Sequence, residues 1–371
     1  MTEQPLRGRR IATVLATSTG GVGTHVRAIL PGLLASGALV RVCGPPATDE
    51  LFGFGETRAQ FRPVCIAAGL APPQDARALI GLRRALRGAD LIHAHGLRAG
   101  LLCVLARPNA PVVVTLHNAL LGPPGLRKRL NRALEQIVVR GADVVLAASL
   151  DLAEHARELG GSDIRSAPVS APPLPPPTLS RERVRAELGV PEHAPVLLSV
   201  GRLHQQKGYD TLLNAAGAWR ARSDGLRVLI AGDGPLHGQM SERIEREALP
   251  VTLLGRRSDV SNLLAASDMV VLTSRWEARA LVVQEAMRAG RPVVATAVGG
   301  IPELIGHGAG ILIPPSDPSA LQEAVREVLG DPARAAALAA AGVAAAATWP
   351  TVDDTVAHLK ALYTELLGSP E

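Results

Sequence analysis

The chain has 371 residues, of which 47% are hydrophobic and 20% are charged. This balance excludes disorder and collagen-like structure and suits about two globular domains. The formal charge of +5 permits an anionic ligand or a membrane surface without requiring nucleic acid. With only three Trp, two Tyr and three Phe, the chain lacks the aromatic stacking surface of nucleic-acid-binding proteins, so we expect no nucleic-acid partner.

The N-terminal region superficially resembles a signal peptide, because Arg7, Arg9 and Arg10 precede an apolar run. That run covers only 11–16, which is shorter than the apolar part of a secretory signal. We interpret it as a first strand and expect a cytoplasmic protein. No stretch reaches the roughly 18 consecutive apolar residues of a membrane-spanning helix.

The three cysteines, Cys43, Cys65 and Cys103, have no Cys-x-x-Cys spacing and lie in apolar surroundings. We expect all three to be buried, reduced and chemically inert.

Short apolar runs alternate with amphipathic segments along the chain. This pattern is typical of parallel sheets covered by helices, so the predicted fold class is α/β. In the first half, strands are predicted at 11–16, 39–43, 90–94, 111–116 and 143–147. In the second half, they are predicted at 195–200, 226–231, 250–254, 269–272, 292–295 and 310–313. Helices are predicted at 24–36, 126–140, 211–222 and 279–289, among others.

The two halves are similar to each other in pattern. Residues 142–149 read ADVVLAAS, and residues 267–274 read SDMVVLTS. Between the halves, the segment 167–177 contains six prolines and almost no charge, which is typical of a stiff linker. We place the domain boundary there. In domains of this class, ligands bind beyond the carboxyl ends of the parallel strands.

A glycine-rich turn, 18–25, follows the first predicted strand and contains Gly20 and Gly21. Glycines at such a turn let backbone amides approach a phosphate or a sugar at the positive end of the next helix. The turn does not fit a dinucleotide fingerprint, because Val26 stands where the third glycine belongs. A turn that simply needs positive φ is an equally good interpretation.

The loop 201–208 has the sequence GRLHQQKG and follows a predicted strand of the second half. Arg202 can bond two oxygens of a diphosphate, and Lys207 can act as a point charge beside it. Lys207 is one of only three lysines in the chain, which favours a specific role over two solvated cations.

Two glutamates follow a later strand, within 273–287. Glu277 and Glu285 are eight residues apart, which would place them on nearly the same face of one helix. There they could accept hydrogen bonds from sugar and ribose hydroxyls, respectively. The alternative is a helix-start carboxylate at Glu277 and a surface charge at Glu285. The apolar neighbours of Glu285 would make an unpartnered charge costly.

Taken together and in this order, the motifs resemble those of the retaining glycosyltransferases of family 4. The resemblance covers nearly the whole chain and implies the GT-B architecture, two Rossmann-like domains that face each other across a cleft. It further implies an acceptor-binding domain over 1–170, a nucleotide-sugar-binding domain over 171–349 and a last helix in 350–371 that crosses back to the first domain. The matching motifs are the glycine turn, the 201–208 loop, Ala231-Gly-Asp-Gly, the pair Glu277 and Glu285, and Val298-Gly-Gly-Ile-Pro-Glu.

The resemblance also implies roles for single residues. The implied catalytic group comprises His117, which would face the donor sugar, Glu277, which would contact its hydroxyls, and Arg202 and Lys207, which would hold the diphosphate. Glu285 would bind the ribose. The remaining implied donor-binding residues are Gly20, Gly21, Gly201 and Gly232, Leu254 and Arg256 beside the base, and Ala280 and Leu281 beside the phosphate. His93 and His95 also stand at a predicted strand end, which makes them further candidates.

The predicted reaction is the transfer of a hexose from a UDP- or GDP-linked sugar to a hydroxyl of an acceptor sugar or lipid-linked acceptor, with retention at the anomeric carbon. No cofactor or metal site is expected, because no Asp-x-Asp motif stands at a strand end. The sequence departs from many relatives in having Ala278-Arg279-Ala280 where glycines are common. The alternatives are a GT-B sugar-nucleotide epimerase and a non-catalytic scaffold.

The helix 126–140 carries an apolar stripe and four basic residues in its first turns. The stripe, called the leucine stripe below, consists of Leu126, Leu130, Leu134 and Ile137, and the basic residues are Arg127, Lys128, Arg129 and Arg132. The favoured interpretation is that the leucines face the core and the cations are solvated. The alternative, together with the apolar loop of Phe52 and Phe54, is a surface that rests on anionic lipid at the inner membrane face.

Overall fold

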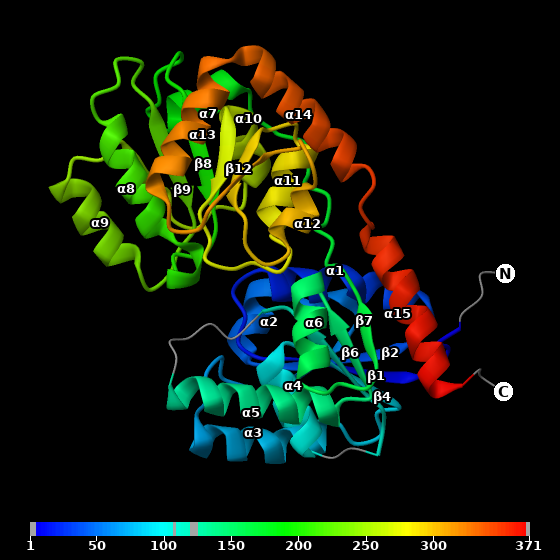
Figure 1. Cartoon of the computed structure of the whole chain (residues 1–371). Coiled ribbons are helices and arrows are strands. Elements are labelled where there is room, and N and C mark those ends of the chain that lie inside the picture. Colours follow the sequence, from blue (N-terminus) through cyan, green and yellow to red (C-terminus); the bar gives the residue numbers. More distant parts are fainter. Residues whose placement is uncertain (1–4, 107–108, 119–124, 369–371) are drawn as a thin grey trace. The chain divides into compact units, whose positions relative to one another are not determined.

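The computed structural model describes residues 5–106, 109–118 and 125–368. The chain forms two compact units (Figure 1). One contains residues up to Pro172 together with those from Pro350 onward, and the other runs from Pro173 to Trp349. Both divisions fall next to prolines, and the first lies inside the proline-rich segment 167–177.

The first unit is built on a parallel sheet of seven strands in the order β3-β2-β1-β4-β5-β6-β7. Its central strands are buried along their length, as expected where helices cover both faces of a sheet, and they are mostly apolar except for two histidines in LIHAH of residues 91–95 and one threonine in VVVTL of residues 112–116. The strands are β1 (Arg10–Leu15), β2 (Leu39–Gly44), β3 (Gln60–Pro63), β4 (Leu91–His95), β5 (Val112–Leu116), β6 (Val144–Ala147) and β7 (Ile164–Ser166).

The helices of the first unit include the last helix of the chain, α15. It begins with a capping box formed by Thr351 and Asp354 and packs against α1 through Val356, Leu359 and Tyr363. These helices are α1 (Gly21–Ala35), α2 (Pro46–Phe52), α3 (Pro72–Ala85), α4 (Leu97–Ala106), α5 (Leu126–Gly141), α6 (Leu150–Glu158) and α15 (Val352–Leu367), with a 3-10 turn at Phe54–Thr57.

The second unit has a parallel sheet of six strands in the order β10-β9-β8-β11-β12-β13. In its strand at 196–200, Leu197 packs into one apolar cluster and Leu198 into another. Because successive side chains of a strand point to opposite faces, this sheet is buried on both faces. The strands are β8 (Val196–Val200), β9 (Arg227–Ala231), β10 (Val251–Leu253), β11 (Met269–Leu272), β12 (Val293–Thr296) and β13 (Ile311–Ile313).

The helices of the second unit are α7 (Arg181–Glu187), α8 (Tyr209–Trp219), α9 (His237–Arg246), α10 (Val260–Ala266), α11 (Leu281–Arg288), α12 (Ile301–Ile305), α13 (Pro318–Gly330) and α14 (Pro332–Ala346), with a 3-10 turn at Gln205–Lys207. Within the described ranges, no single helix is long and apolar enough to cross a membrane. The pair α13 and α14 passes that test together on length and composition, but the two helices are bent by 102° and pack on this unit.

The predicted strands are confirmed to within about a residue at their ends, and two strands were missed. β3 ends in a proline and β7 has three residues, and both lie at sheet edges, where short strands carry little apolar pattern. The cysteine prediction was wrong for Cys65. Its side chain is exposed, because it alternates with buried Val64 and Ile66 just after β3.

Candidate functional site

In the second unit, the loops after β8, β9 and β10 are joined by backbone hydrogen bonds. The Gly201 amide donates to the Ala231 carbonyl at 3.0 Å, and the Gly232 amide donates to the Gly255 carbonyl at 2.8 Å. Gly232 has φ 152°, and a Cβ there would lie 1.9 Å from the Gly201 oxygen. Only glycine allows this approach. The structure therefore brings Gly201 and Gly232 together, with half-buried Leu254 on the adjoining loop.

The same sheet end carries a short ion pair. Lys207 Nζ lies 2.6 Å from Glu277 Oε1, and Ser274 Oγ donates to the same oxygen at 2.6 Å. The Lys207 and Glu277 side chains are 20% and 10% exposed. Gly208 has φ 60°, and a Cβ there would lie 2.1 Å from the Thr273 oxygen, so glycine lets the Lys207 loop close onto the loop after β11.

The structure corrects the predicted position of Glu277. Helix α11 begins at Leu281, so Glu277 lies in the loop before the helix and does not share a helix face with Glu285. The Glu277 carbonyl accepts the Gly300 amide at 2.9 Å, which fixes this loop against the one after β12. Sequence reasoning missed Ser274, although it ends the strand-like repeat at 267–274.

The two cations of the predicted diphosphate clamp differ in their surroundings. Lys207 is neutralised by Glu277. The Arg202 side chain is exposed and forms no hydrogen bond or ion pair with any residue that the structure describes. Arg256, predicted beside the base, is likewise exposed. Arg202 is therefore available to an anion without breaking an internal contact.

The residues that replace the expected glycines adopt ordinary backbone angles. Ala280 caps α11 with φ −61° and ψ 118°, and its side chain and that of Ala278 are buried. The non-glycine residues with positive φ in the described chain lie elsewhere, at Arg58, Ala248 and Ser316. The amides at Ala280 and Leu281 thus begin α11 without a side-chain cap and without needing glycine.

Glu285 lies on α11 in apolar surroundings. Burial raises the pKa of its carboxyl from 4.5 to about 7, and nearby Arg288 partly opposes that rise. Near neutral pH this group is therefore close to half protonated.

Arg279 was not predicted as a functional residue. Its side chain is 7% exposed, its guanidinium lies 5.6 Å from the centre of the Trp349 ring, and it stands 3.9 Å from Glu303. Its Nε is buried with no hydrogen-bond partner among the described residues. Nothing in the sequence pattern distinguishes this arginine from the many others.

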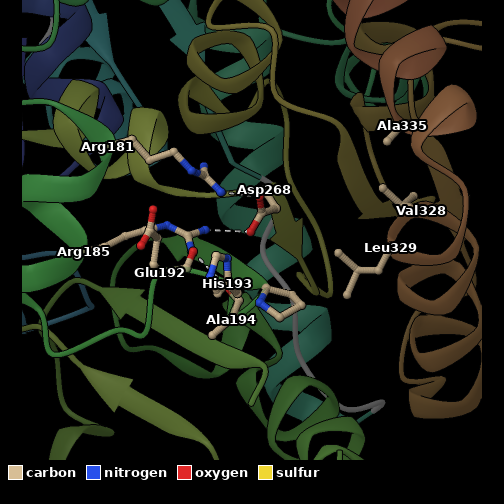
Figure 2. Close-up of a pocket in the computed structure, with 10 residues that line it drawn as sticks. Arg181, Arg185, Glu192, His193, Ala194, Asp268, Val328, Leu329 and Ala335 are labelled. Carbon is tan, nitrogen blue, oxygen red and sulfur yellow. Dashed lines mark hydrogen bonds and ion pairs between the residues drawn. The ribbon is translucent and has the colours of Figure 1, made fainter. Parts of the chain in front are cut away.

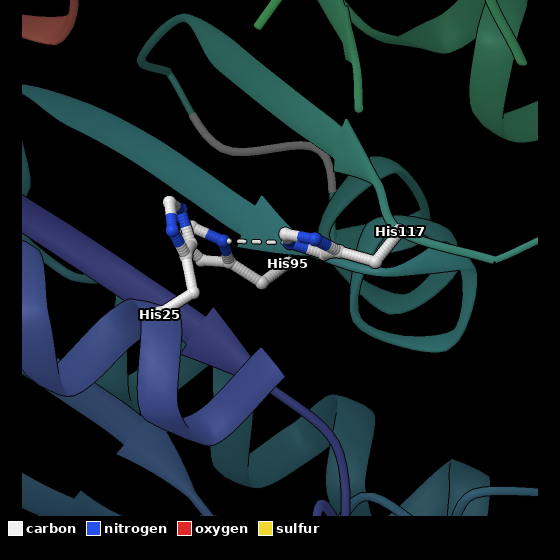
Figure 3. A group of neighbouring side chains, drawn as sticks. All are labelled: His25, His95 and His117. Atoms are coloured by element: carbon white, nitrogen blue, oxygen red, sulfur yellow. Dashed lines mark hydrogen bonds between the residues drawn. The ribbon is translucent and has the colours of Figure 1, made fainter. Parts of the chain in front are cut away.

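In the first unit, three histidines meet at the carboxyl end of the sheet (Figure 3). His25 comes from the first turns of α1, His95 ends β4, and His117 follows β5. His95 Nδ1 and His117 Nε2 are 3.2 Å apart. Burial lowers the pKa of His25 to about 4 and holds the pKa values of His95 and His117 well below their usual range. All three imidazoles are therefore neutral at pH 7.

His93 has a structural role. Its Nδ1 lies 2.6 Å from the Tyr363 hydroxyl on α15, and its Nε2 lies 2.6 Å from Thr115 Oγ1. With both ring nitrogens bonded and no exposed surface, His93 ties β4, β5 and the last helix together.

The glycine turn after β1 contains glycines with different uses. Gly20 and Gly21 are exposed at the start of α1, and a Cβ at Gly20 would meet nothing within 4 Å. A Cβ at Gly23 would instead overlap the Phe52 ring at 2.1 Å. The first two glycines leave the helix start open to a ligand, whereas Gly23 serves packing.

Comparison with known proteins identifies the family. Residues 20–172 match the glycosyl transferase 4-like domain, and residues 180–344 match the glycosyl transferases group 1. The D-inositol 3-phosphate glycosyltransferase of Kineococcus radiotolerans is 31% identical over 70% of this chain and 67% of its own length. The corresponding enzyme 1 of Catenulispora acidiphila is 31% identical over 72% of this chain and 70% of its own. The chain belongs to the group 1, family 4 glycosyltransferases.

Solved structures confirm the GT-B fold of this glycosyltransferase. Anabaena Alr3699/HepE, in complex with UDP-glucose, superposes with a TM-score of 0.82 at 22% identity, covering 96% of this chain and 100% of that one. WaaG, a glycosyltransferase involved in lipopolysaccharide biosynthesis, superposes with a TM-score of 0.76 at 19% identity, covering 97% and 100%. The family matches make the protein a transferase enzyme, and the superpositions show its two Rossmann-like units.

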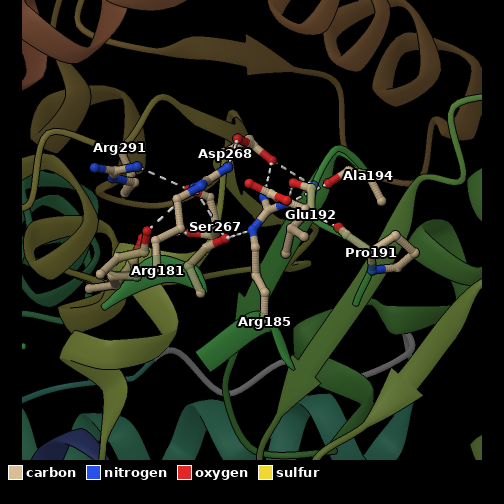
Figure 4. Close-up of polar contacts among 12 residues, drawn as sticks. Arg181, Arg185, Pro191, Glu192, Ala194, Ser267, Asp268 and Arg291 are labelled. Carbon is tan, nitrogen blue, oxygen red and sulfur yellow. Dashed lines mark hydrogen bonds and ion pairs between the residues drawn. The ribbon is translucent and has the colours of Figure 1, made fainter. Parts of the chain in front are cut away.

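The glycosyltransferase also has a pocket of about 260 Å³ at the opposite end of the second sheet, next to the starts of β8 and β11 (Figure 2). Arg185, 3% exposed, donates to the carbonyls of Glu192 and Ala194 at 2.8 Å and to Asp268 at 2.9 Å. Arg181 also donates to Asp268, at 2.6 Å (Figure 4). Since its arginines are already bonded to the protein, this network stabilises the unit.

Proposed function

We propose that this enzyme transfers a hexose from a UDP- or GDP-linked sugar to an acceptor hydroxyl with retained anomeric configuration and without a divalent metal on the diphosphate. The observation that carries the proposal is the exposed, unpaired Arg202 on the same loop as Lys207, at the sheet end where ligands bind in this fold class. The complex of Alr3699/HepE with UDP-glucose supports a nucleotide-sugar donor.

The diphosphate is the group that needs cations, because negative charge grows on it as the sugar leaves. Arg202 can bond two of its oxygens, and the uncapped amides of Ala280 and Leu281 add the positive end of α11. Electrostatic stabilisation of this kind takes the place of a metal ion.

Lys207 and Glu277 act together in this proposal. In the free enzyme each neutralises the other at 2.6 Å. A donor that places phosphate oxygens near Lys207 draws the ammonium away and leaves Glu277 free to accept hydrogen bonds from sugar hydroxyls. Ser274 keeps the carboxylate oriented during the exchange.

Glu285 binds the ribose diol in its charged form. The free enzyme holds this carboxyl with a pKa of about 7, so ribose binding favours loss of the proton. Leu254 and Arg256 lie on the loop that we assign to the base, and Gly201 and Gly232 let the backbone approach the donor.

The first unit supplies the acceptor side and His117, which we assign to the donor sugar. The open helix start at Gly20 and Gly21 suits an anionic or polyhydroxyl acceptor. The names of the two relatives above refer to inositol 3-phosphate, a ring polyol that carries a phosphate. We propose an acceptor sugar, a related polyol or a lipid-linked acceptor.

We also propose peripheral contact with anionic lipid at the inner membrane face. The expectation that the leucine stripe of α5 faces the core was wrong for Leu130 and Ile137, which are 50% and 43% exposed. Arg129 and Arg132 are exposed on the same helix. The side chains of Leu126, Arg127 and Lys128 lie outside the described residues. Exposed leucine and isoleucine beside cations favour binding to an interface.

Co-sedimentation with vesicles that contain 30% or so of anionic lipid tests that contact, since each cation near such a surface contributes about 1 kcal/mol. We expect binding that falls with salt and weakens in Arg129→Ala/Arg132→Ala. The control Arg326→Ala/Arg334→Ala, which removes two exposed cations from the other unit, should bind normally. No binding at low salt would contradict the contact.

The scaffold alternative rested on the alanines at 278 and 280, which the structure accommodates with ordinary angles. The epimerase alternative needs a proton taken from the sugar itself. NMR of the product decides among the three: a glycoside with the anomeric configuration of the donor supports the proposal. An altered free nucleotide sugar supports the epimerase, and donor binding without product supports the scaffold.

A thermal-shift panel of UDP, GDP and other nucleoside diphosphates identifies the donor class. A ligand at about 100 times its Kd stabilises the fold by about 2.7 kcal/mol. We expect a rise in Tm with UDP or GDP, and no response to any nucleoside diphosphate would contradict the proposed donor.

A further inference from the structure

The three histidines of the first unit form a nearly regular triangle. The ring centres of His25 and His95 are 5.6 Å apart, those of His95 and His117 are 5.5 Å apart, and those of His25 and His117 are 5.4 Å apart. The start of α1 and the ends of β4 and β5 come together to form this triangle (Figure 3). Each imidazole offers one nitrogen such that the three nitrogens lie within 4.8 Å of one another.

The geometry points to a binding site for one zinc-class transition-metal ion, held by His25, His95 and His117. Two nitrogens bound to the same tetrahedral Zn²⁺ at about 2.0 Å stand roughly 3.3 Å apart. His95 Nδ1 and His117 Nε2 already have that separation, at 3.2 Å. A ring nitrogen of His25 lies within 4.8 Å of one nitrogen of each of the other two rings.

Only one hydrogen bond joins these rings to each other, the one between His95 Nδ1 and His117 Nε2, and a bound ion would replace it. His25 forms no hydrogen bond with any residue in the described ranges, and His95 Nε2 is buried without a partner there. The contrast with His93 is informative, because both nitrogens of that ring are bonded to other side chains and cannot be ligands.

The chemical type of the three ligand atoms determines which metal ions fit this site. Three imidazoles without a thiolate or carboxylate suit Zn²⁺, Co²⁺, Ni²⁺ or Cu²⁺, whereas Mg²⁺ and Ca²⁺ require oxygen ligands. Three protein ligands leave a fourth position for water or another ligand.

The test is metal binding by the full chain and does not depend on glycosyl transfer. After chelation and dialysis, the chain is titrated with Zn²⁺, and in parallel with Co²⁺, whose visible absorption is intense only in tetrahedral sites. We expect one ion per chain, a tetrahedral Co²⁺ spectrum, and a rise in Tm with Zn²⁺ that Mg²⁺ does not reproduce.

Two variants, His25→Gln and His95→Gln, each remove one ligand. Each should weaken Zn²⁺ binding by more than about 100-fold, because loss of a residue that only supports a ligand already costs roughly 10- to 100-fold. The matched controls His155→Gln and His193→Gln remove histidines outside the triangle and should bind Zn²⁺ like the wild type. Absence of a stoichiometric ion in the wild-type chain overturns the proposal. Unchanged Zn²⁺ affinity in His25→Gln or His95→Gln also overturns it, provided that a cooperative thermal unfolding transition without metal shows that the variant is folded.

Discussion

The six strands of the second sheet of this glycosyltransferase repeat the order of six of the seven strands of the first, yet the carboxyl ends of the two sheets hold different chemistry. β3-β2-β1-β4-β5-β6 in the first unit corresponds to β10-β9-β8-β11-β12-β13 in the second. In the first unit, His25 follows β1, His95 ends β4 and His117 follows β5. In the second unit, the loops after β8, β11 and β12 supply Lys207, Glu277 and Gly300.

The comparison shows what the scaffold decides and what the residues decide. The shared topology brings the residues that follow the first, fourth and fifth strands to one place in each unit. Neutral imidazoles fill that place in the first unit and avoid the cost of buried charge. In the second, Lys207 Nζ and Glu277 Oε1 lie 2.6 Å apart and form an ion pair. The first end suits a soft cation or a neutral polar group, and the second suits an anion.

The largest effect should come from removing the cations at the carboxyl end of the second sheet. Arg202→Ala and Lys207→Ala should each lower kcat by about 10²- to 10³-fold, because each removes a cation that stabilises charge formed in the transition state. Steady-state transfer assays measure this, with Lys360→Ala as a control that removes one of the two other lysines. Near-normal turnover in either variant would place the diphosphate clamp elsewhere.

A smaller loss is expected when Glu285 is replaced. Glu285→Gln should weaken binding of the nucleoside diphosphate by about 1.5–3 kcal/mol, because the ribose loses a charged acceptor. In the wild type, affinity should fall as the pH drops through about 7, where the carboxyl becomes protonated. The variant should show a flat pH profile. Calorimetric titration from pH 5.5 to 8.5 measures both, and an unchanged affinity would refute the ribose assignment.

The stability of the free enzyme should respond in the opposite sense. A carboxyl whose pKa is raised on folding stabilises the fold fully below pH 4.5 and loses that contribution as the pH rises through about 7. Glu285→Gln should therefore gain stability relative to the wild type between those values, by up to about 3 kcal/mol at 1.4 kcal/mol per pH unit. Urea unfolding at pH 5 and pH 8 measures the difference.

Sequence reasoning was accurate where local pattern determines the outcome. The strand ends at β1, β4, β5, β8 and β11 followed from apolar runs, and the order of motifs identified the family and the fold. The contact of Lys207 with Glu277 could not be predicted in the same way, because the two residues are 70 positions apart and meet only through the sheet order. Helical periodicity then placed Glu277 on α11, although the helix starts four residues later.

Packing of side chains was also beyond the sequence. His25 gave no signal, since it stands among glycine and valine in a helix start and becomes notable only beside His95 and His117. Leu130 and Ile137 have the spacing of a core stripe, and only the surroundings of α5 show that this stripe is exposed.

At the carboxyl end of the first sheet, a substitution can distinguish the structural histidine, His93, from the three histidines to which we assign a function. Tyr363→Phe removes the hydroxyl bonded to His93 and leaves a buried nitrogen unpaired, which should cost about 1–3 kcal/mol of stability. Donor affinity should not change, because neither residue faces the proposed ligands. Chemical unfolding and a nucleotide titration measure the two quantities. A weakened donor affinity with normal stability would mean that His93 belongs to the functional group.

The smallest expected effect concerns chelation and bears on both sheet ends at once. If Arg202, Lys207 and the start of α11 stabilise the diphosphate, EDTA should leave kcat unchanged. The three histidines predict a complementary response: Zn²⁺ should inhibit, since it would hold the His117 ring that we assign to the donor sugar, and EDTA should restore activity. Loss of activity in EDTA with recovery in Mg²⁺ or Mn²⁺ would contradict the metal-free mechanism. It would not bear on the proposed zinc site. Zn²⁺ that binds the three histidines without inhibiting would instead argue against a contact between His117 Nε2 and the sugar, because the metal would hold the lone pair of that nitrogen.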